Sequence, residues 1–531
     1  MCLLSMGNMP VFAVTESVDI GIFYGNNSQY PAGISSDTGF DLIIEKNGLA
    51  VSEVNLTNYK SLKVYKAGFY VSDILQTGAQ SYYSNGNVKG AFTNLIGLPV
   101  ADVSEIIPQF QAYKIIAPNI ALFYNGNWQI SYGTYLTLAD AQNDVASIKA
   151  LIPETQVVST QVSKSQMIAY DGTTPLISYD TSAAEVVFKA AQIQFNDVTY
   201  RDGVMFKRLT TSDYSVINHI EMDHYLYGVL PKEMSTSWPL EALKAQAIAA
   251  RNYTLINLNK HSAMGFDLCN TTDCQVYGGL GVEGAISNQA VDETSGLILT
   301  YQGEIASCYY HSNSGGETED ISNIWTGDLP YIYGKTDPYS IGQPNDSWTL
   351  TLSAAQISEA LKAYGKDIGS YQSVSIGEVS EHGRILKITF VGSGGSATLL
   401  KEEMRRVFGN TTLKSMYFSL SPPEIPKFSV QSSGGLVDIN TTGVSVMTTS
   451  GIVSLADNAY VQQVTGLSVL SGSLKMSSTS QSSGSSLTLY GKGYGHGLGM
   501  SQWGAKGMAD AGKTFADILT FYFTGTQISV R

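Results

Sequence analysis

Short runs of alternating apolar and polar residues dominate the start of the chain. Residues 18–24 and 40–44 alternate in this way, and Asn-, Ser- and Gly-rich turns separate the runs. Alternation with a period of two is typical of strands that bury one face. We therefore expect a β-rich N-terminal domain over residues 14–110.

A small mixed segment follows this domain. The pattern predicts strands over residues 120–124 and 128–135, a helix over 138–151, where apolar residues lie three or four apart, and a further strand from Gln156. This order resembles the SPOR module, a small fold that binds peptidoglycan glycan stripped of its peptides. We expect such a glycan-binding module within residues 111–180, with a generic ββαβ spacer as the alternative.

The strongest helical pattern lies near the middle of the chain, after several strands over residues 186–222. Ser237 is a suitable N-cap and Pro239 suits a first helical turn. From there to about Leu258, small alanines occupy several faces of the predicted helix, so other backbone segments must approach it closely. The sequence thus predicts a buried scaffold helix.

Two inserted regions are expected in the second half. Residues 348–420 show the order βαββαβ, which suggests a ferredoxin-like subdomain. Residues 422–487 are rich in Ser, Thr and Gly with short Val-rich runs, as in a β-rich lobe. The 531 residues allow three or four domains at roughly 150 residues each, and the predicted class is a multidomain α+β protein.

Composition narrows the function classes. The net charge is −14, with 14% charged and 43% hydrophobic residues, which disfavours both disorder and nucleic-acid binding. The chain has no apolar run long enough for a transmembrane helix. Residues 1–13 resemble the end of a secretory signal without its basic start, and a buried N-terminal strand is the alternative. Together with the resemblance of residues 111–180 to a module that binds peptidoglycan, these residues lead us to expect a secreted, cell-envelope protein of bacterial origin.

The most informative motif lies in residues 225–253. It reads Tyr-Leu-Tyr-Gly-Val-Leu-Pro-Lys-Glu-Met, then Trp-Pro-Leu-Glu-Ala-Leu-Lys-Ala-Gln-Ala and Ala-Ala-Arg, and resembles the signature of the SpoIID/LytB family of stage II sporulation protein D and amidase enhancers. The resemblance implies that Glu233 is the general acid and base of a lytic transglycosylase. We expect Glu233 on the loop before the helix, where burial raises and the helix N-terminus lowers a carboxyl pKa. Glu241 is expected to be an ordinary first-turn acid.

Three further windows extend the resemblance over residues 185–531. They are 266–279, with Asp-Leu-Cys and Cys-Gln-Val-Tyr, 305–318, with Ser-Asn-Ser-Gly-Gly-Glu-Thr, and 491–505, with Gly-Lys-Gly-Tyr-Gly-His-Gly-Leu-Gly-Met-Ser-Gln. The resemblance implies that the following residues bind substrate: Arg251, Gln275, Tyr277, Ser312, Ser314, Thr318, His496 and Gln502.

The windows can also be explained by a purely structural role. The serine-rich window suits a tight turn, and His496 could simply fix its own loop. A phosphate-binding loop is disfavoured for the glycine-rich window 491–505, because no frame of that window completes Gly-x-Gly-x-x-Gly and the window holds no Gly-Lys-Ser/Thr. A serine hydrolase is disfavoured because the pattern Gly-x-Ser-x-Gly is missing. The lone residues His219, His224 and His382 are expected to be structural or surface residues.

The cysteines leave three alternatives open, namely a zinc site, a disulfide and free thiols. Four cysteines in so long a chain exclude a disulfide scaffold. Some members of the resembled family bind zinc through a His and two Cys, which implies Cys269, Cys274 and His261 here. The spacing of His261 departs from the expected pattern, so a Cys269–Cys274 disulfide is an equally good interpretation for an exported protein.

The resemblance implies a specific reaction. A lytic transglycosylase cleaves the bond between N-acetylmuramic acid and N-acetylglucosamine, preferably in denuded glycan strands, and requires no cofactor; a structural zinc is one of the alternatives at the cysteines. The alternative function is a non-catalytic amidase enhancer that binds peptidoglycan and stimulates a cell-wall amidase. The expected partners are glycan strands and such an amidase.

Overall fold

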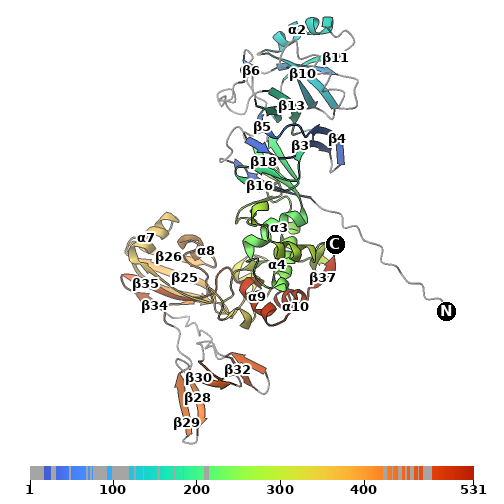
Figure 1. The fold of residues 1–531 in the computed structure, drawn as a ribbon. Coiled ribbons are helices and arrows are strands. Elements are labelled where there is room, and N and C mark those ends of the chain that lie inside the picture. The colour runs from blue at the N-terminus through green and yellow to red at the C-terminus, as the bar shows by residue number, and fades with distance from the viewer. Residues whose placement is uncertain are drawn as a thin grey trace, which may run out of the picture. The chain divides into compact units, whose positions relative to one another are not determined.

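The computed structural model describes residues 17–531 with interruptions, of which 76–91, 98–118 and 470–480 are the longest, whereas 214–422 and 481–531 are continuous. The expected signal segment over residues 1–13 lies outside the described residues. The chain is a mixed α+β protein with several sheets and more strand than helix, as the sequence predicts (Figure 1). None of the described helices is long and apolar enough to cross a membrane.

The chain forms two compact units. The first comprises residues up to 235 together with 254–288, and the second comprises 236–253 together with 289–531.

A seven-stranded sheet forms one layer of the first unit, in the order β19-β1-β18-β17-β14-β3-β4. Its alternate apolar residues are buried, among them Val18 and Ile20. Strands on both sides of the predicted domain boundary at 180–185 pair in this sheet. The strands are β1 (Ser17–Phe23), β3 (Phe40–Lys46), β4 (Leu49–Leu56), β14 (Glu185–Lys189), β17 (Gly203–Arg208), β18 (Tyr214–Glu221) and β19 (Leu268–Cys269).

A ten-stranded sheet also belongs to this unit, in the order β11-β8-β10-β9-β13-β12-β5-β2-β15-β16. Its strands are β2 (Ala32–Ser35), β5 (Ser61–Lys66), β8 (Phe92–Gly97), β9 (Asn119–Tyr124), β10 (Asn127–Tyr135), β11 (Gln156–Gln161), β12 (Gln166–Asp171), β13 (Thr174–Asp180), β15 (Ile193–Phe195) and β16 (Val198–Tyr200). A separate short hairpin joins β6 (Tyr70–Val71) and β7 (Ile74–Leu75).

The predicted strand–strand–helix–strand segment is present in this sheet. Helix α2 (Leu138–Leu151) packs Ile148 against Ile96 and Ile130. Strand β8, which precedes the predicted range 111–180, lies between β11 and β10 in this sheet. The glycan-binding role of this segment stays a prediction.

The predicted scaffold helix is α4 (Leu240–Ile256). Alanines at 242, 245, 247, 249 and 250 are fully buried, as expected from their spacing. Asn252 of this helix donates hydrogen bonds to the carbonyl oxygens of Leu299 and Ala306, at 2.7 and 2.8 Å. These bonds join the helix to the strand β20 (Leu297–Tyr301) and the segment after β21 (Glu304–Ile305).

The inserted region 348–420 differs from the expected βαββαβ order. Its elements are β23 (Ser347–Ser353), α7 (Ala354–Ala363), β24 (Tyr371–Val379), β25 (Ile385–Gly392), β26 (Gly395–Leu400), α8 (Glu403–Phe408) and β27 (Phe418–Ser419). Strand β26 was not expected. Gly395 adopts φ +147°, which only glycine adopts readily, and so allows a tight reversal into β26.

The strands of this region divide between two sheets, β23-β35-β27 and β26-β25-β24-β34, whereas a ferredoxin-like fold has one. Each sheet also contains one strand from the far side of the three hairpins in the sequence. Strand β35 (Ser486–Lys492) belongs to the first sheet and β34 (Gln481–Ser483) to the second. Ile357 and Leu361 of α7 pack with Val374, Ile388 and other apolar residues in one core, and Figure 1 shows α7 and α8 beside these strands.

Three hairpins lie within the β-rich lobe expected over 422–487, whose last described residues, from 481 on, instead form β34 and the start of β35. The hairpins are β28 (Lys427–Ser432) with β29 (Gly435–Asn440), β30 (Ser445–Thr448) with β31 (Gly451–Ser454), and β32 (Tyr460–Gln463) with β33 (Gly466–Val469). The chain then closes with β36 (Met500–Ser501), α9 (Gln502–Asp510), α10 (Phe515–Tyr522) and β37 (Gln527–Val530).

Candidate functional site

Glu233 is the last residue of helix α3 (Met222–Glu233), not part of a loop as the sequence suggested. Met234 is the C-cap of this helix. Its backbone is extended, and its N–H donates a hydrogen bond to the carbonyl oxygen of Leu230. Gly228 and Pro231 made the segment look non-helical, but tertiary packing outweighs their low helix propensity here. A helix C-terminus carries partial negative charge, the opposite of the environment expected from the sequence.

The position of Glu233 follows from the period of the helix. Leu226, Val229 and Leu230 of α3 are fully buried, and residues three and four apart share one face. Glu233 is the next position on that apolar face, and it is partly buried. Its carboxyl group therefore lies where the buried face of the helix meets the surface.

Gln275 and Tyr277, predicted to bind substrate, have partners inside the protein. Gln275 donates a hydrogen bond to the hydroxyl of Thr254 at 3.0 Å. Tyr277 is only 6% exposed, and its ring packs against Gly228 of α3, where a Cβ atom would lie 2.4 Å from the ring. Glycine at 228 therefore lets the ring lie directly on the helix that carries Glu233. Both side chains therefore pack against α3, Gln275 through a hydrogen bond to the hydroxyl of Tyr225 and Tyr277 through its ring.

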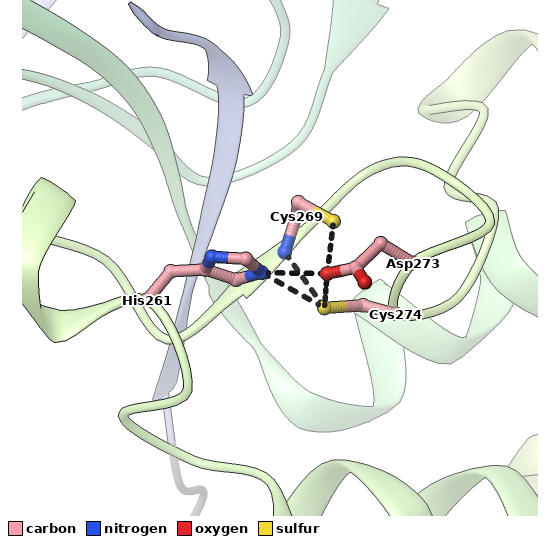
Figure 2. Close-up of side chains that lie close together, drawn as sticks. All are labelled: His261, Cys269, Asp273 and Cys274. Carbon is pink, nitrogen blue, oxygen red and sulfur yellow. Dashed lines mark hydrogen bonds and ion pairs between the residues drawn. The ribbon is translucent and has the colours of Figure 1, made fainter. Parts of the chain in front are cut away.

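Four potential metal ligands gather beside this segment, as Figure 2 shows. The Nε2 atom of His261, the sulfurs of Cys269 and Cys274 and a carboxylate oxygen of Asp273 all lie within 4.8 Å of one another. His261 Nε2 is 3.3 Å from the Cys274 sulfur and 3.2 Å from Asp273 Oδ2. Asp273 Oδ2 is 4.0 and 3.9 Å from the two sulfurs.

This donor set fits zinc. Tetrahedral zinc with N, O and S ligands separates its ligand atoms by about 3.3–3.8 Å, close to the distances found. The spacing of His261 along the chain is no obstacle, because the turn η4 (Ser262–Met264) and Gly265, at φ +85°, fold the chain back and let the His261 N–H bond to the carbonyl of Asp267. Asp273, adjacent to Cys274, is a fourth candidate ligand that the sequence did not indicate.

The two thiols of this cluster are chemically unequal. Burial acts to raise the pKa of Cys269, but hydrogen bonds from Thr271 and Cys274 outweigh it and lower that pKa. Burial raises the pKa of Cys274 to about 11. Both cysteines are free in the structure, as is Cys308, a buried residue of the second unit. The disulfide stays an untested alternative.

The other two motifs lie side by side in the second unit. Strand β22 (Tyr310–His311) pairs in parallel with β36, so that His311 lies opposite Ser501. The backbone N–H groups of Asn313 and Tyr494 bond to each other's carbonyl oxygens, at 3.0 and 2.7 Å. Two windows that are far apart in the sequence thus form one structure.

Buried polar contacts fix the serine-rich window. Ser314 is fully buried, and its hydroxyl donates to Asp337 Oδ2 at 2.7 Å, while its N–H donates to the hydroxyl of Ser501 at 3.2 Å. Burial raises the pKa of Asp337 to about 6. Asp337 was not expected from the sequence, since nothing near residue 337 marks it as the partner of a serine more than twenty residues away.

Three other predicted substrate-binding residues are also buried. Arg251 donates to the carbonyl of Leu297 at 3.1 Å, and the hydroxyl of Thr318 lies near the carbonyls of Tyr333 and Lys335. Gln502 is the first residue of α9. Their contact with substrate stays a proposal.

Among the predicted substrate-binding residues of these two motifs, Ser312 and His496 are partly exposed. His496 Nδ1 accepts a hydrogen bond from the N–H of Leu498 at 3.0 Å, and its ring lies 5.0 Å from that of Trp325. Burial, aided by the charges of Arg405 and Arg384, lowers the pKa of His496 to about 3. The imidazole is therefore neutral at physiological pH and suited to hydrogen bonding rather than to carrying charge.

Comparisons with known proteins match two parts of the chain. Residues 210–301 match the family model described as stage II sporulation protein (SpoIID), and residues 342–437 match a domain of unknown function (DUF8618). The first match contains Glu233 and all four candidate metal ligands. The second covers most of the inserted subdomain.

Full-length relatives extend the similarity. The amidase enhancer of Bacillus subtilis is 32% identical over 317 residues, which are 57% of this chain and 40% of that protein. The stage II sporulation protein D of the same organism is 28% identical over 334 residues, 60% of this chain and 77% of that protein. An uncharacterized protein of Brachyspira hyodysenteriae is 31% identical over 334 residues, 63% of this chain and 73% of that protein.

Proposed function

We propose that this chain, which belongs to the SpoIID family and is related to cell-wall proteins, is an extracytoplasmic lytic transglycosylase that uses Glu233 as its acid and base. One observation carries the proposal. The only carboxyl group of the family motif outside the scaffold helix lies partly buried at the end of the apolar face of α3. The acid of a proton-transfer reaction needs such a half-shielded position.

A single carboxyl group suffices for this reaction. Hydrolytic glycosidases use two carboxylates, one of them as nucleophile or base. In the proposed reaction Glu233 first donates its proton to the glycosidic oxygen as that bond breaks. The resulting carboxylate then takes the proton of the C6 hydroxyl as its oxygen bonds to C1 of the same N-acetylmuramic acid. The product is a 1,6-anhydro sugar, no water is consumed, and Glu233 regains its proton.

We also propose a structural zinc ion held by His261, Cys269, Asp273 and Cys274. Zinc with four protein ligands keeps no open position, so its contribution is to cross-link the chain rather than to activate water. The cross-link would fix the loop that leads to Gln275 and Tyr277, and both residues contact α3, Gln275 through a hydrogen bond to the hydroxyl of Tyr225 at 3.4 Å and Tyr277 through Gly228.

Product analysis tests the proposal. Purified protein should release 1,6-anhydro products from denuded glycan strands, each lighter by one water than the product of hydrolysis. Glu233→Gln should keep the fold and lower the rate by several orders of magnitude, because an amide of similar shape cannot donate the proton. More than about a tenth of the wild-type rate in this variant would remove Glu233 from the role.

Glu241→Gln is the matched control. Glu241 lies in the first turn of α4, where its carboxylate accepts hydrogen bonds from Lys244 at 3.1 Å and from the N–H of Phe515 at 2.7 Å. These contacts give it a role in packing, so its replacement should change the rate by no more than a few-fold.

The amidase enhancer named among the relatives favours a second candidate function, stimulation of a cell-wall amidase without catalysis. Adding the Glu233→Gln variant to a cell-wall amidase separates the two. Stimulation by this variant, together with no 1,6-anhydro product from the wild type, would identify the chain as an enhancer.

A further inference from the structure

The hairpin tip between β24 and β25 of the inserted subdomain reaches the serine-rich motif. The tip consists of residues 380–384, and the N–H of Ser380 bonds to the carbonyl of Arg384 at 2.8 Å while the N–H of Gly383 bonds to the carbonyl of Ser380 at 3.0 Å. Two internal hydrogen bonds across five residues define one turn conformation. The tip can therefore present its side chains in fixed directions.

Alternate residues of the tip contact the segment 314–320. The hydroxyl of Ser380 donates to Glu319 Oε2 at 2.5 Å. His382 Nδ1 lies 3.5 Å from Glu317 Oε2. Arg384 Nη2 donates to the carbonyl oxygen of Ser314 at 3.2 Å. The inserted subdomain thus contacts the serine-rich motif through three side chains. These contacts let the fold of the subdomain fix the position of the motif.

Arg384 also contacts the glycine-rich motif. A Cβ atom at Gly497 would lie 2.3 Å from the guanidinium carbon, so the backbone of the motif rests directly on this side chain. The ring of Tyr417 lies 5.4 Å from the guanidinium group. One planar cation therefore fills the space between the two motifs and contacts both of them.

The burial of Arg384 is unfavourable for stability. The side chain is 1% exposed, and its Nε and Nη1 atoms have no hydrogen-bond partner among the described residues. A buried cation that lacks full pairing lowers the free energy of unfolding, and an apolar residue of similar size is often at least as stable. Retaining an arginine here indicates a requirement other than stability.

We propose that Arg384 is a positioning residue for the glycan site, and that the inserted subdomain is part of this site. Through Ser314 and Gly497 it sets the separation of Ser312 and His496, the two predicted substrate-binding residues of these motifs that are partly exposed. This inference rests on the proposed function, because it assumes a glycan ligand. It gives a role to the region that matches a domain of unknown function.

The test measures glycan binding separately from cleavage. The full chain carrying Glu233→Gln is titrated with denuded glycan strands, with and without Arg384→Met, and urea unfolding checks the fold. Arg384→Met should keep or raise the unfolding midpoint and weaken glycan binding by at least about tenfold, since displaced groups lose their hydrogen-bond geometry. Arg384→Lys keeps the charge but loses the planar fork, so it should restore only part of the affinity.

Arg406→Met is the control, because Arg406 is an exposed arginine on α8 of the same subdomain. It should leave the affinity unchanged. If Arg384→Met does not fold, Ser380→Ala and Arg384→Lys replace it, since both keep the volume beneath Gly497 nearly filled. A folded Arg384 variant that binds glycan as tightly as the parent, or unchanged affinity in both replacements, overturns the inference.

The outcomes also distinguish this inference from the proposed function. Release of 1,6-anhydro products by the wild type together with unchanged affinity in Arg384→Met would overturn only the role of Arg384. Weaker binding in Arg384→Met together with no product from the wild type would overturn only the transglycosylase. Measuring kcat and KM of Arg384→Met in the otherwise wild-type chain adds a further check, because a positioning role predicts a raised KM.

Discussion

The hydroxyl of Tyr277 donates a hydrogen bond to the side-chain oxygen of Asn218, at 2.8 Å, within the core of the first unit. Asn218 in turn donates to the carbonyl oxygens of Arg201 and Gly203, at 2.9 and 2.8 Å. The tyrosine ring lies against Gly228 of α3. A single aromatic side chain therefore joins the helix that carries Glu233 to the sheet behind it.

Tyr277→Phe should lower the free energy of unfolding of the first unit by about 1–2 kcal/mol, because it leaves the buried oxygen of Asn218 without its donor. Urea denaturation measures the change. Tyr59→Phe, at a partly exposed tyrosine of the same unit, is the control and should have little effect. Equal midpoints for wild type and Tyr277→Phe would mean that water replaces the hydroxyl.

The metal centre can be tested by elemental analysis. Protein purified without chelator should contain about one zinc per chain, and Asp273→Asn and Cys274→Ser should each reduce that content, because both remove a ligand. Cys308→Ser should retain the metal, since Cys308 is a buried cysteine outside the cluster. Removal of zinc should also lower the thermal midpoint, since a ligand bound only to the native state stabilises it.

Two results would contradict the zinc site. A mass lower by two hydrogens in unreduced, metal-free protein would identify the Cys269–Cys274 disulfide instead. Alkylation of both thiols in native, metal-free protein would make the segment an ordinary loop.

Substrate choice provides another test. The resemblance to the SpoIID family implies a preference for glycan without stem peptides. We expect denuded strands to be cleaved and intact sacculi to be cleaved poorly, and pretreatment of sacculi with an amidase should restore cleavage. Product release measured by mass spectrometry gives the rates, and equal rates on both substrates would contradict the preference.

His382 should make the stability of the second unit depend on pH. A hydrogen bond with Glu317 outweighs burial and raises the pKa of His382 above 6.5, and Asp320 and Glu381 lie 3.8 and 3.9 Å from its ring nitrogen. Its stabilising contribution is therefore fully present below the unfolded-state pKa and is lost as the pH rises through the folded-state pKa.

His382→Gln should accordingly lower the free energy of unfolding at about pH 5, by roughly 1 kcal/mol or less, and have a smaller effect at about pH 9. Urea denaturation at the two pH values measures this difference. The difference should shrink in a Glu317→Gln background, which removes the main partner. A loss that is the same at both pH values would show that His382 contributes only through packing.

Local patterns predicted the regular elements of the site but not their surroundings. Pro239 and the alanine spacing predicted α4 correctly. Helix α3 was missed because Gly228 and Pro231 normally oppose helix formation, and only the ring of Tyr277, nearly fifty residues later, explains why glycine occupies position 228. A long-range packing requirement of this kind leaves no local trace in the sequence.

The metal cluster shows the same limitation. Cys269, Cys274 and His261 were recognised as candidates, but the distance along the chain made His261 look misplaced. The left-handed turn at Gly265 reverses the chain and returns the imidazole to the cysteines. Linear spacing predicts ligand sets well only when the intervening backbone is regular.

Strand β1 lies between β18 and β19, so its partners in the sheet are residues 216–221 and 268–269. Closing loops of this length has a high entropic cost, and topologies with such distant contacts fold slowly. During synthesis β1, with Val18 and Ile20 on its apolar face, has no partner in this sheet until β18 has been made, and the segment around Cys269 completes its pairing later. The first unit should therefore complete its folding late during synthesis. A circular permutant that places β1 next to β18 in the sequence should form the same sheet faster.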